Sequence, residues 1–215
     1  MLIGLGYRKQ SGKDTVAHYL AEHYGFHQIA FADNVKKAAM TVFGFTHDQM
    51  YGTEQEKSKV DPRWSMTPRY AMQTLGATMR NVFSQDIWVK SVELSIAQLR
   101  GQLVVADAQR PDQNQLIGEV NRPNTERGIA FCFEQQFQNI VVSDVRYRNE
   151  ADMIRRLGGV LIRVDRPSLG ENQDTHESEI DLVDYDFDYV ILNDGDVGSL
   201  NQKVDRFCLE YVNEG

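Results

Sequence analysis

The chain has 215 residues, of which 41% are hydrophobic and 25% charged, and its formal net charge is −8 at pH 7. This composition is typical of a single globular domain over residues 1–215, and the acidic balance argues against nucleic-acid binding through a broad basic face. No apolar run approaches the roughly 20 residues of a membrane-spanning helix. The absence of a signal-peptide pattern, with two isolated cysteines (Cys132 and Cys208), favours a reducing, cytoplasmic compartment.

The first 24 residues have the pattern of a strand, a loop and a helix. Residues 2–6 are an apolar strand candidate, residues 11–15 read Ser-Gly-Lys-Asp-Thr, and residues 14–24 have helical periodicity. This order is typical of a phosphate-binding P-loop, in which backbone N–H groups and the positive end of the helix hold phosphates. Lys13 would add its charge at the β and γ phosphates. The alternative is a strand-to-helix turn with a surface lysine.

Two residues depart from the usual G-x-x-x-x-G-K-S/T pattern. Tyr7 stands where the first glycine is expected, and Gly6 is one residue too far from Gly12. Asp14 replaces the hydroxyl residue that commonly ligates Mg²⁺, and Thr15 follows it. Asp14 and Thr15 are therefore candidate metal ligands, and the longer glycine spacing puts the usual shape of the loop in question.

The next segments carry weaker signals. Residues 27–31 are predicted to form a strand that is closed by Ala32 and Asp33, and residues 34–42 to form a helix. Asp33 would orient an acceptor or a metal, or would cap that helix. Residues 46–68 are expected to be irregular, and residues 68–99 helical with a break at Gly76. In that helix Arg69 and Arg80 are 11 residues apart and would share a face.

The second half alternates strands and helices. Strands are expected over 139–143, 160–164 and 189–192, and helices over 149–157 and 199–211. Apolar strands alternating with helices indicate an α/β fold whose parallel sheet is covered on both faces. Residues 101–138 are rich in Gln, Asn and Pro around strand candidates at 103–106 and 129–133, and we interpret them as an insertion.

Charged side chains follow the predicted strands. Asp144 ends an apolar strand as a Walker-B carboxylate does, so it would lie near Lys13 and the metal or would simply cap the next turn. Phosphoryl transfer depends on cations around the transferring group, and Arg146, Arg148, Arg163 and Arg166 follow strands, although any single arginine is commonly a solvated surface group. Residues 168–179 are polar and contain Gly170, which is typical of a mobile lid.

Several motifs occur in an order that resembles a known family. They are Gly12-Lys13-Asp14-Thr15, Phe31-Ala32-Asp33, Trp88-Val89-Lys90, the run Ser-Asp-Val-Arg-Tyr-Arg-Asn-Glu-Ala at 143–151, Arg166-Pro167, His176-Glu177-Ser178-Glu179 and Asn193-Asp194-Gly195. Together they resemble the bacteriophage-type deoxynucleoside monophosphate kinases, relatives of adenylate kinase. The resemblance implies a P-loop kinase fold, a three-layer αβα sandwich with a five-stranded parallel core in the order 2-3-1-4-5. It also implies Mg²⁺-dependent transfer from ATP to a deoxynucleoside monophosphate (dNMP), supplying DNA precursors for a phage in the host cytoplasm. The family shares Asp14.

The resemblance also implies roles for individual residues. It divides the chain into a monophosphate-binding region at about 34–100, an insertion at about 101–138 and a lid at about 166–180. The insertion would be an oligomerisation hairpin, making a homodimer, or a cover for the acceptor site. The implied catalytic residues are Lys13, Arg146 and Arg166, with Arg163 as the alternative to Arg166. The implied ATP-binding residues are Ser11, Gly12, Lys13, Asp14, Thr15 and Asn193, and the implied metal ligands are Asp14, Thr15 and Asp144. The implied substrate-binding residues are Asp33, Lys37, Arg69, Arg80, Asp144, Arg146 and Glu150.

Two other functions fit the same motifs. One is a P-loop kinase for another small acceptor, since the sequence does not identify base-recognising residues. The other is a non-catalytic nucleotide-binding switch, although the guanine motif Asn-Lys-x-Asp has only a distant counterpart at 201–205. ADP formation that depends on an added monophosphate would distinguish the kinase from the switch.

Overall fold

The computed structural model describes residues 1–101, 103–104, 116–117, 136–170 and 181–212. The chain divides into two compact units. The first consists of Met1–Ile29 and Glu93–Gly215, and the second of Ala30–Val92. The predicted strand at 129–133, Cys132, His176 and most of the predicted insertion lie outside the described residues.

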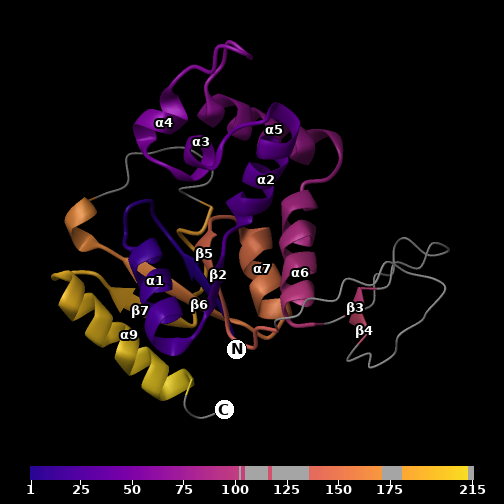
Figure 1. Cartoon of the computed structure of the whole chain (residues 1–215). Coiled ribbons are helices and arrows are strands. Elements are labelled where there is room, and N and C mark those ends of the chain that lie inside the picture. Colours follow the sequence, from indigo (N-terminus) through magenta and orange to yellow (C-terminus); the bar gives the residue numbers. More distant parts are fainter. Residues whose placement is uncertain (102, 105–115, 118–135, 171–180, 213–215) are drawn as a thin grey trace. The chain divides into compact units, whose positions relative to one another are not determined.

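The first unit contains a five-stranded parallel sheet (Figure 1). Its strands are β1 (Leu2–Gly6), β2 (His27–Ile29), β5 (Ile140–Val145), β6 (Val160–Asp165) and β7 (Tyr189–Leu192). They are ordered β2-β5-β1-β6-β7, which is 2-3-1-4-5 when the five strands are counted along the chain. The predicted fold class and strand order are therefore confirmed.

Helices cover both faces of this sheet. On one face α1 (Lys13–Tyr24) and α9 (Val197–Tyr211) share a buried cluster with Ile3 and Leu5 of β1. On the other face, a Cβ added at Gly4 would lie 3.1 Å from Ile154 of α7 (Arg148–Arg156). Alternate residues of β1 thus face opposite layers, which explains why the strand is apolar along its whole length.

The second unit is helical. It contains α2 (Phe31–Phe43), α3 (His47–Tyr51), α4 (Glu54–Ser58), α5 (Pro68–Val82) and the start of α6 (Ile87–Leu99). Its core is formed by Ala39, Phe45, Met50 and Ala71.

Three predictions for the second unit were wrong in detail. Residues 31–33 belong to α2, not to the preceding strand. Residues 46–68 contain two short helices, each begun by a capping box, in which Thr46 pairs with Gln49 and Thr53 with Glu56. The break in the predicted helix at 68–99 falls between Val82 and Ile87 rather than at Gly76.

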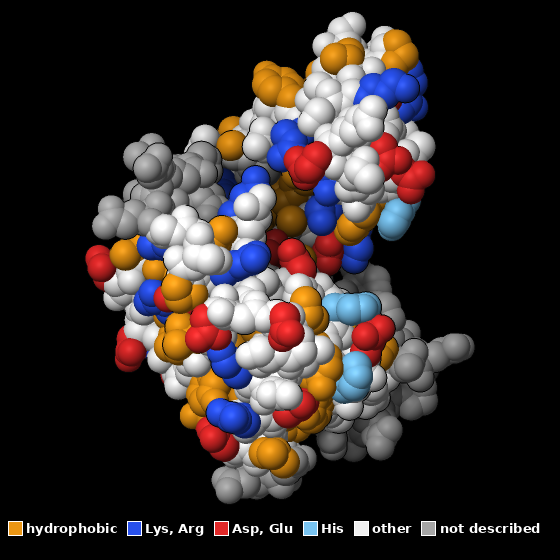
Figure 2. Space-filling model, turned by 90° about the vertical axis from the view of Figure 1, so that its left-hand side faces the viewer, with side chains coloured by type: hydrophobic (Ala, Val, Ile, Leu, Met, Phe, Trp, Pro, Cys, Tyr) orange, Lys and Arg blue, Asp and Glu red, His pale blue; other side chains and the backbone are white. Residues whose placement is uncertain are grey.

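Other predicted elements agree with the structure to within two residues at each end. The strand predicted at 103–106 is observed at Leu103–Val104 (β3), and it pairs antiparallel with Leu116–Ile117 (β4), which was not predicted. Of the helices described, none is both long and apolar enough to cross a membrane. On the described part of the face in Figure 2, basic and acidic side chains are interspersed.

Candidate active site

The loop between β1 and α1 makes a tight turn with the backbone of a phosphate-binding loop. Tyr7, Gln10 and Gly12 have φ angles of 99°, 61° and 108°. These values lie in the left-handed region that glycine adopts readily and other residues rarely adopt. Tyr7 therefore takes up the conformation expected of the missing first glycine. The longer sequence spacing between Gly6 and Gly12 does not prevent the loop from making this turn.

Lys13 lies inside this turn. Its side chain is buried, with 8% of the residue exposed, at the start of α1. The ammonium group donates to the carbonyl of Tyr7 at 2.9 Å and to the carbonyl of Arg8. The loop thus wraps around the cation that the sequence predicts to contact phosphate.

The end of β7 holds the loop from the side. The Asn193 side chain donates from Nδ2 to the Ser11 carbonyl at 2.9 Å, and a Cβ added at Gly12 would lie 2.6 Å from the same nitrogen. Only glycine fits at position 12, because its φ is positive and Asn193 is in contact with it. The sequence analysis gave Asn193 as an ATP-binding residue, and the structure gives it a hydrogen bond to the loop.

Lys203 of α9 fixes the turn that follows Asn193. Its ammonium donates to the Leu192 carbonyl at 2.7 Å and pairs with the Asp194 carboxylate. The lysine lowers the pKa of the Asp194 carboxyl below its ordinary value. This contact was not predicted, since the sequence gives no sign that α9 reaches back to the turn.

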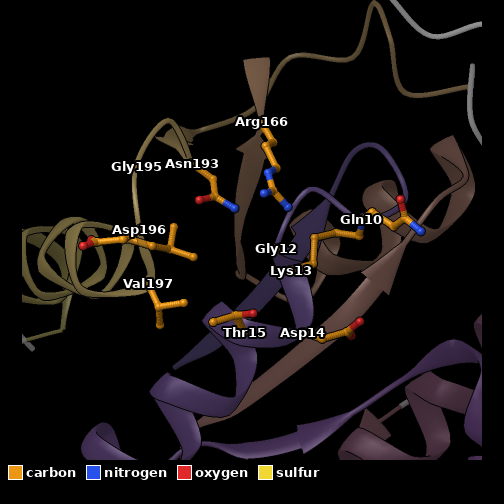
Figure 3. A pocket seen from close by; sticks show the side chains of 11 residues that line it. Gln10, Gly12, Lys13, Asp14, Thr15, Arg166, Asn193, Gly195, Asp196 and Val197 are labelled. Carbon is orange, nitrogen blue, oxygen red and sulfur yellow. The ribbon is translucent and has the colours of Figure 1, made fainter. Parts of the chain in front are cut away.

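A cavity of about 480 Å³ opens beside the loop. Figure 3 shows Arg166, beyond the end of β6, and Asn193, beyond the end of β7, with side chains directed toward the loop, while Asp14 and Thr15 lie in the first turn of α1. The cavity is lined by Gln10, Gly12, Lys13, Asp14, Thr15, Arg166, Asn193, Gly195, Asp196, Val197 and Leu200. The structure therefore brings together the predicted ATP-binding residues, with Ser11 fully buried in the loop.

Arg163 and Arg166 have different surroundings, although sequence reasoning treated them as alternatives. Arg166 is exposed and lines the cavity. Arg163, on β6, has its Cζ 3.8 Å from the centre of the Tyr7 ring and its Nη2 2.8 Å from Asp165 Oδ2. Arg8, which was not predicted, donates from Nη1 to the Gly170 carbonyl at 2.6 Å.

The predicted residues of β5 and α7 lie next to the loop strand in the sheet. Val145 is in register with Gly6, so Asp144 is near the end of β1, but it lies within β5 rather than after it. Glu150 is 2% exposed, and its Oε2 accepts from the backbone nitrogens of Arg146 at 2.8 Å and Tyr147 at 3.2 Å. Glu150 thus satisfies the start of α7, a structural role that the sequence analysis did not assign.

The remaining predicted residues lie in the second unit. Asp33, in the first turn of α2, accepts from the Ala30 nitrogen at 2.9 Å and lies 3.7 Å from the Lys36 ammonium. Lys37 is exposed on α2, and Arg69 pairs with the exposed Glu54. Arg69 and Arg80 are 11 residues apart on α5, which places them within about 20° around the helix and about 16 Å apart along it.

A parallel sheet in this order, with a loop of P-loop type between its first strand and first helix, is the fold of the P-loop kinases. The chain belongs to the deoxynucleotide monophosphate kinase family. It is 38% identical to the deoxynucleotide monophosphate kinase of Enterobacteria phage T4, over 94% of this chain and 96% of that protein. A relative from Acanthamoeba polyphaga mimivirus, provisionally given the same name, is 33% identical over 99% of this chain and 94% of its own length.

Two further matches concern a family model and a solved structure. The model of the family described as deoxynucleotide monophosphate kinase matches residues 125–204. Among solved structures, a dephospho-CoA kinase from Campylobacter jejuni is similar over 97% of this chain and 96% of its own, with a TM-score of 0.46 and 12% sequence identity. Membership of a kinase family implies ATP as the phosphoryl donor and nucleotides as substrates.

Proposed function

We propose that the protein transfers the γ-phosphoryl group of ATP to the phosphate of a dNMP, giving ADP and the deoxynucleoside diphosphate. The observation that carries this proposal is the cavity in which the loop, Lys13 and Arg166 converge. An oxygen of the dNMP phosphate forms a bond to the γ-phosphorus while the bond to the bridging oxygen of ADP breaks. The protein's part is to position both nucleotides and to stabilise the charge of the transferring group.

Different residues of the cavity would have different roles in this transfer. The loop nitrogens and the first turn of α1 would hold the β and γ phosphates, because unpaired helical N–H groups bind anions. Lys13, at the same turn, would place a positive charge at the bond that breaks. Arg166 is the exposed cation that can follow the phosphoryl group as it moves, since a guanidinium can donate two hydrogen bonds to phosphate at once.

The same turn suits Mg²⁺. Asp14 and Thr15 line the cavity and offer a carboxylate and a hydroxyl oxygen, which are the hard ligands that Mg²⁺ prefers. Asp144, on the adjacent strand, is the third proposed ligand, directly or through water. When bound, the ion would neutralise phosphate charge.

We assign the acceptor dNMP to cations of the second unit. Lys37, Arg69 and Arg80 supply positive charge, and the distance along α5 means that the two arginines would contact different parts of the nucleotide. Arg69 is free to exchange its exposed partner Glu54 for phosphate, because such surface pairs contribute little stability. Within the first unit, Asp144 and Arg146 are also proposed to contact the dNMP, and Glu150 holds the start of α7. Asp33 holds the start of α2 in the second unit.

Two parts of the proposal concern segments that lie largely outside the described residues. One is the lid at about 166–180, of which Arg166–Gly170 is described. The other is the insertion at about 101–138 and the homodimer that it would form. Sedimentation of the full chain and of a chain with residues 105–135 replaced by a short linker tests the dimer directly.

The experiment that tests the proposed function is an ADP-release assay over the nucleoside monophosphates and their deoxy forms, with Mg²⁺ and ATP. We expect ADP release to require an added monophosphate and to be faster with at least one deoxynucleotide than without any acceptor. ADP release at the same rate without an acceptor would indicate a nucleotide-hydrolysing switch. Turnover only with small phosphate acceptors other than nucleotides would favour the alternative hypothesis, a P-loop kinase for another small acceptor.

A further inference from the structure

Tyr7 is the residue that departs most clearly from the P-loop pattern, and the structure shows where its ring lies. The residue is 9% exposed, so a large aromatic side chain is buried where the motif expects no side chain at all. The Arg163 guanidinium lies over the ring, with Cζ 3.8 Å from its centre. A cation at this distance from an aromatic face is attracted by the electrons of the ring.

Arg163 is itself held in place. Arg163 lies on β6 in register with Gly6, the last residue of β1, so its position on the strand is next to the start of the loop. Its Nη2 donates to Asp165 Oδ2 at 2.8 Å. The guanidinium is therefore fixed by a carboxylate of its own strand and by the Tyr7 ring.

The backbone of Tyr7 faces the key cation of the site. Its φ of 99° turns the chain where a non-glycine residue is disfavoured. In this conformation the Tyr7 carbonyl accepts from the Lys13 ammonium at 2.9 Å. The ring is thus held by Arg163 while the carbonyl of the same residue holds Lys13.

We propose that Tyr7 is a positioning residue for the phosphate loop, which keeps its shape because Arg163 holds the Tyr7 ring. The proposal rests on the ATP site proposed above and assigns Arg163 to the loop and Arg166 to phosphate. In this chain the loop shape depends on a tertiary contact, whereas a glycine would supply it through backbone freedom alone.

The test compares Tyr7→Gly with Tyr7→Phe, using calorimetric titration of ATP in the absence of acceptor. Tyr7→Gly favours the observed φ and removes the ring, so it separates the two roles of the residue. We expect ATP to bind about tenfold more weakly to Tyr7→Gly, the scale of a desolvated cation–aromatic contact. Tyr7→Phe, which keeps the ring, should restore most of the affinity. ATP binding to Tyr7→Gly as tight as to the wild type would overturn the proposal.

A second pair of variants tests the partner independently of Tyr7. Arg163→Met should weaken ATP binding by a similar factor, whereas Arg206→Met, at an exposed position of α9, is the matched arginine control. The double variant Tyr7→Gly/Arg163→Met should bind ATP no more weakly than the weaker single variant, because both remove the same contact. Losses that multiply in the double variant would show that the two residues act separately and would overturn the proposal.

Steady-state kinetics distinguish an effect on the phosphate loop alone from an effect on the whole active site. We expect the KM for ATP to rise in Tyr7→Gly and Arg163→Met while the KM for the dNMP stays within about twofold, since the contact touches only the loop. Equal rises in both constants would contradict the assignment. Failure of the wild-type protein to bind ATP would instead contradict the proposed function on which it rests.

Discussion

Replacing Asn193 by alanine tests how the phosphate loop is held. The substitution removes the donor to the Ser11 carbonyl, which lies 2.9 Å from Asn193 Nδ2 in a residue that is fully buried. A buried acceptor left without a partner costs about 1–3 kcal/mol. If all of this were expressed in ATP binding, the affinity would fall by about 5- to 150-fold.

Part of that cost falls on folding, because the hydrogen bond belongs to the protein itself. We therefore expect a loss of about tenfold in ATP affinity, with a fall in Tm of about 2–4 °C for each kcal/mol that appears as stability. Calorimetric titration measures the loss in ATP affinity, and thermal unfolding of the same samples measures the loss in stability. Asn81→Ala, at an exposed position on α5, is the matched control.

The choice of ligand decides between two roles of Asn193. A residue that holds the loop affects every ligand with a phosphate chain, so Asn193→Ala should weaken ATP and inorganic tripolyphosphate by the same factor. A residue that contacts the base affects ATP alone. Undiminished tripolyphosphate binding in Asn193→Ala, with weakened ATP binding, would show instead that Asn193 contacts the base and does not hold the loop.

Three further predictions concern residues outside the loop. Asp144→Asn should lower the initial rate and shift its Mg²⁺ dependence to higher concentration; an unchanged magnesium titration would make Asp144 a structural residue. Glu150→Ala leaves two backbone donors without their carboxylate and should cost about 3 kcal/mol of stability in denaturant unfolding, whereas a stable variant with weakened dNMP binding would favour substrate contact. Burial raises the pKa of the Cys208 thiol from 9.0 to about 11, so its contribution to stability is complete below pH 9.0 and lost as pH rises toward about 11. In Cys208→Ala, the unfolding free energy should therefore decline less steeply with pH in that window, by up to about 1.4 kcal/mol per pH unit. Equal slopes in the wild type and the variant would contradict the raised pKa of the Cys208 thiol.

The sheet could be predicted from the sequence because each central strand is buried on both faces. Residues 2–6 and 140–142 are apolar along their length, which is the pattern of a covered parallel strand. The short helices α3 and α4 were missed, although their capping boxes are visible in the sequence as Thr46 with Gln49 and Thr53 with Glu56. The break predicted at Gly76 does not occur, because α5 continues through this glycine to Val82 and a single glycine is tolerated within a helix that packs well.

The site was predictable in its composition but not in its contacts. Gly12 and Lys13 identify the loop through local sequence alone. The role of Tyr7 depends on Arg163, which is 156 residues away in the chain, and the role of Asn193 depends on Ser11, 182 residues away. No local pattern encodes such pairs. The backbone conformation of Tyr7 also runs against its residue type, so only the folded chain can reveal it.

The most direct test of the central claim is to identify the products formed from ATP and a dNMP. Phosphorus NMR of the full chain with Mg²⁺, ATP and the best acceptor from the panel should show ADP and deoxynucleoside diphosphate appearing in equal amounts. Lys13→Ala, if folded by circular dichroism, should slow this transfer at least about 10²-fold, the scale of losing one charge-stabilising group at the reacting centre. ADP with inorganic phosphate in place of the deoxynucleoside diphosphate, or near-wild-type transfer by a folded Lys13→Ala, would contradict the account.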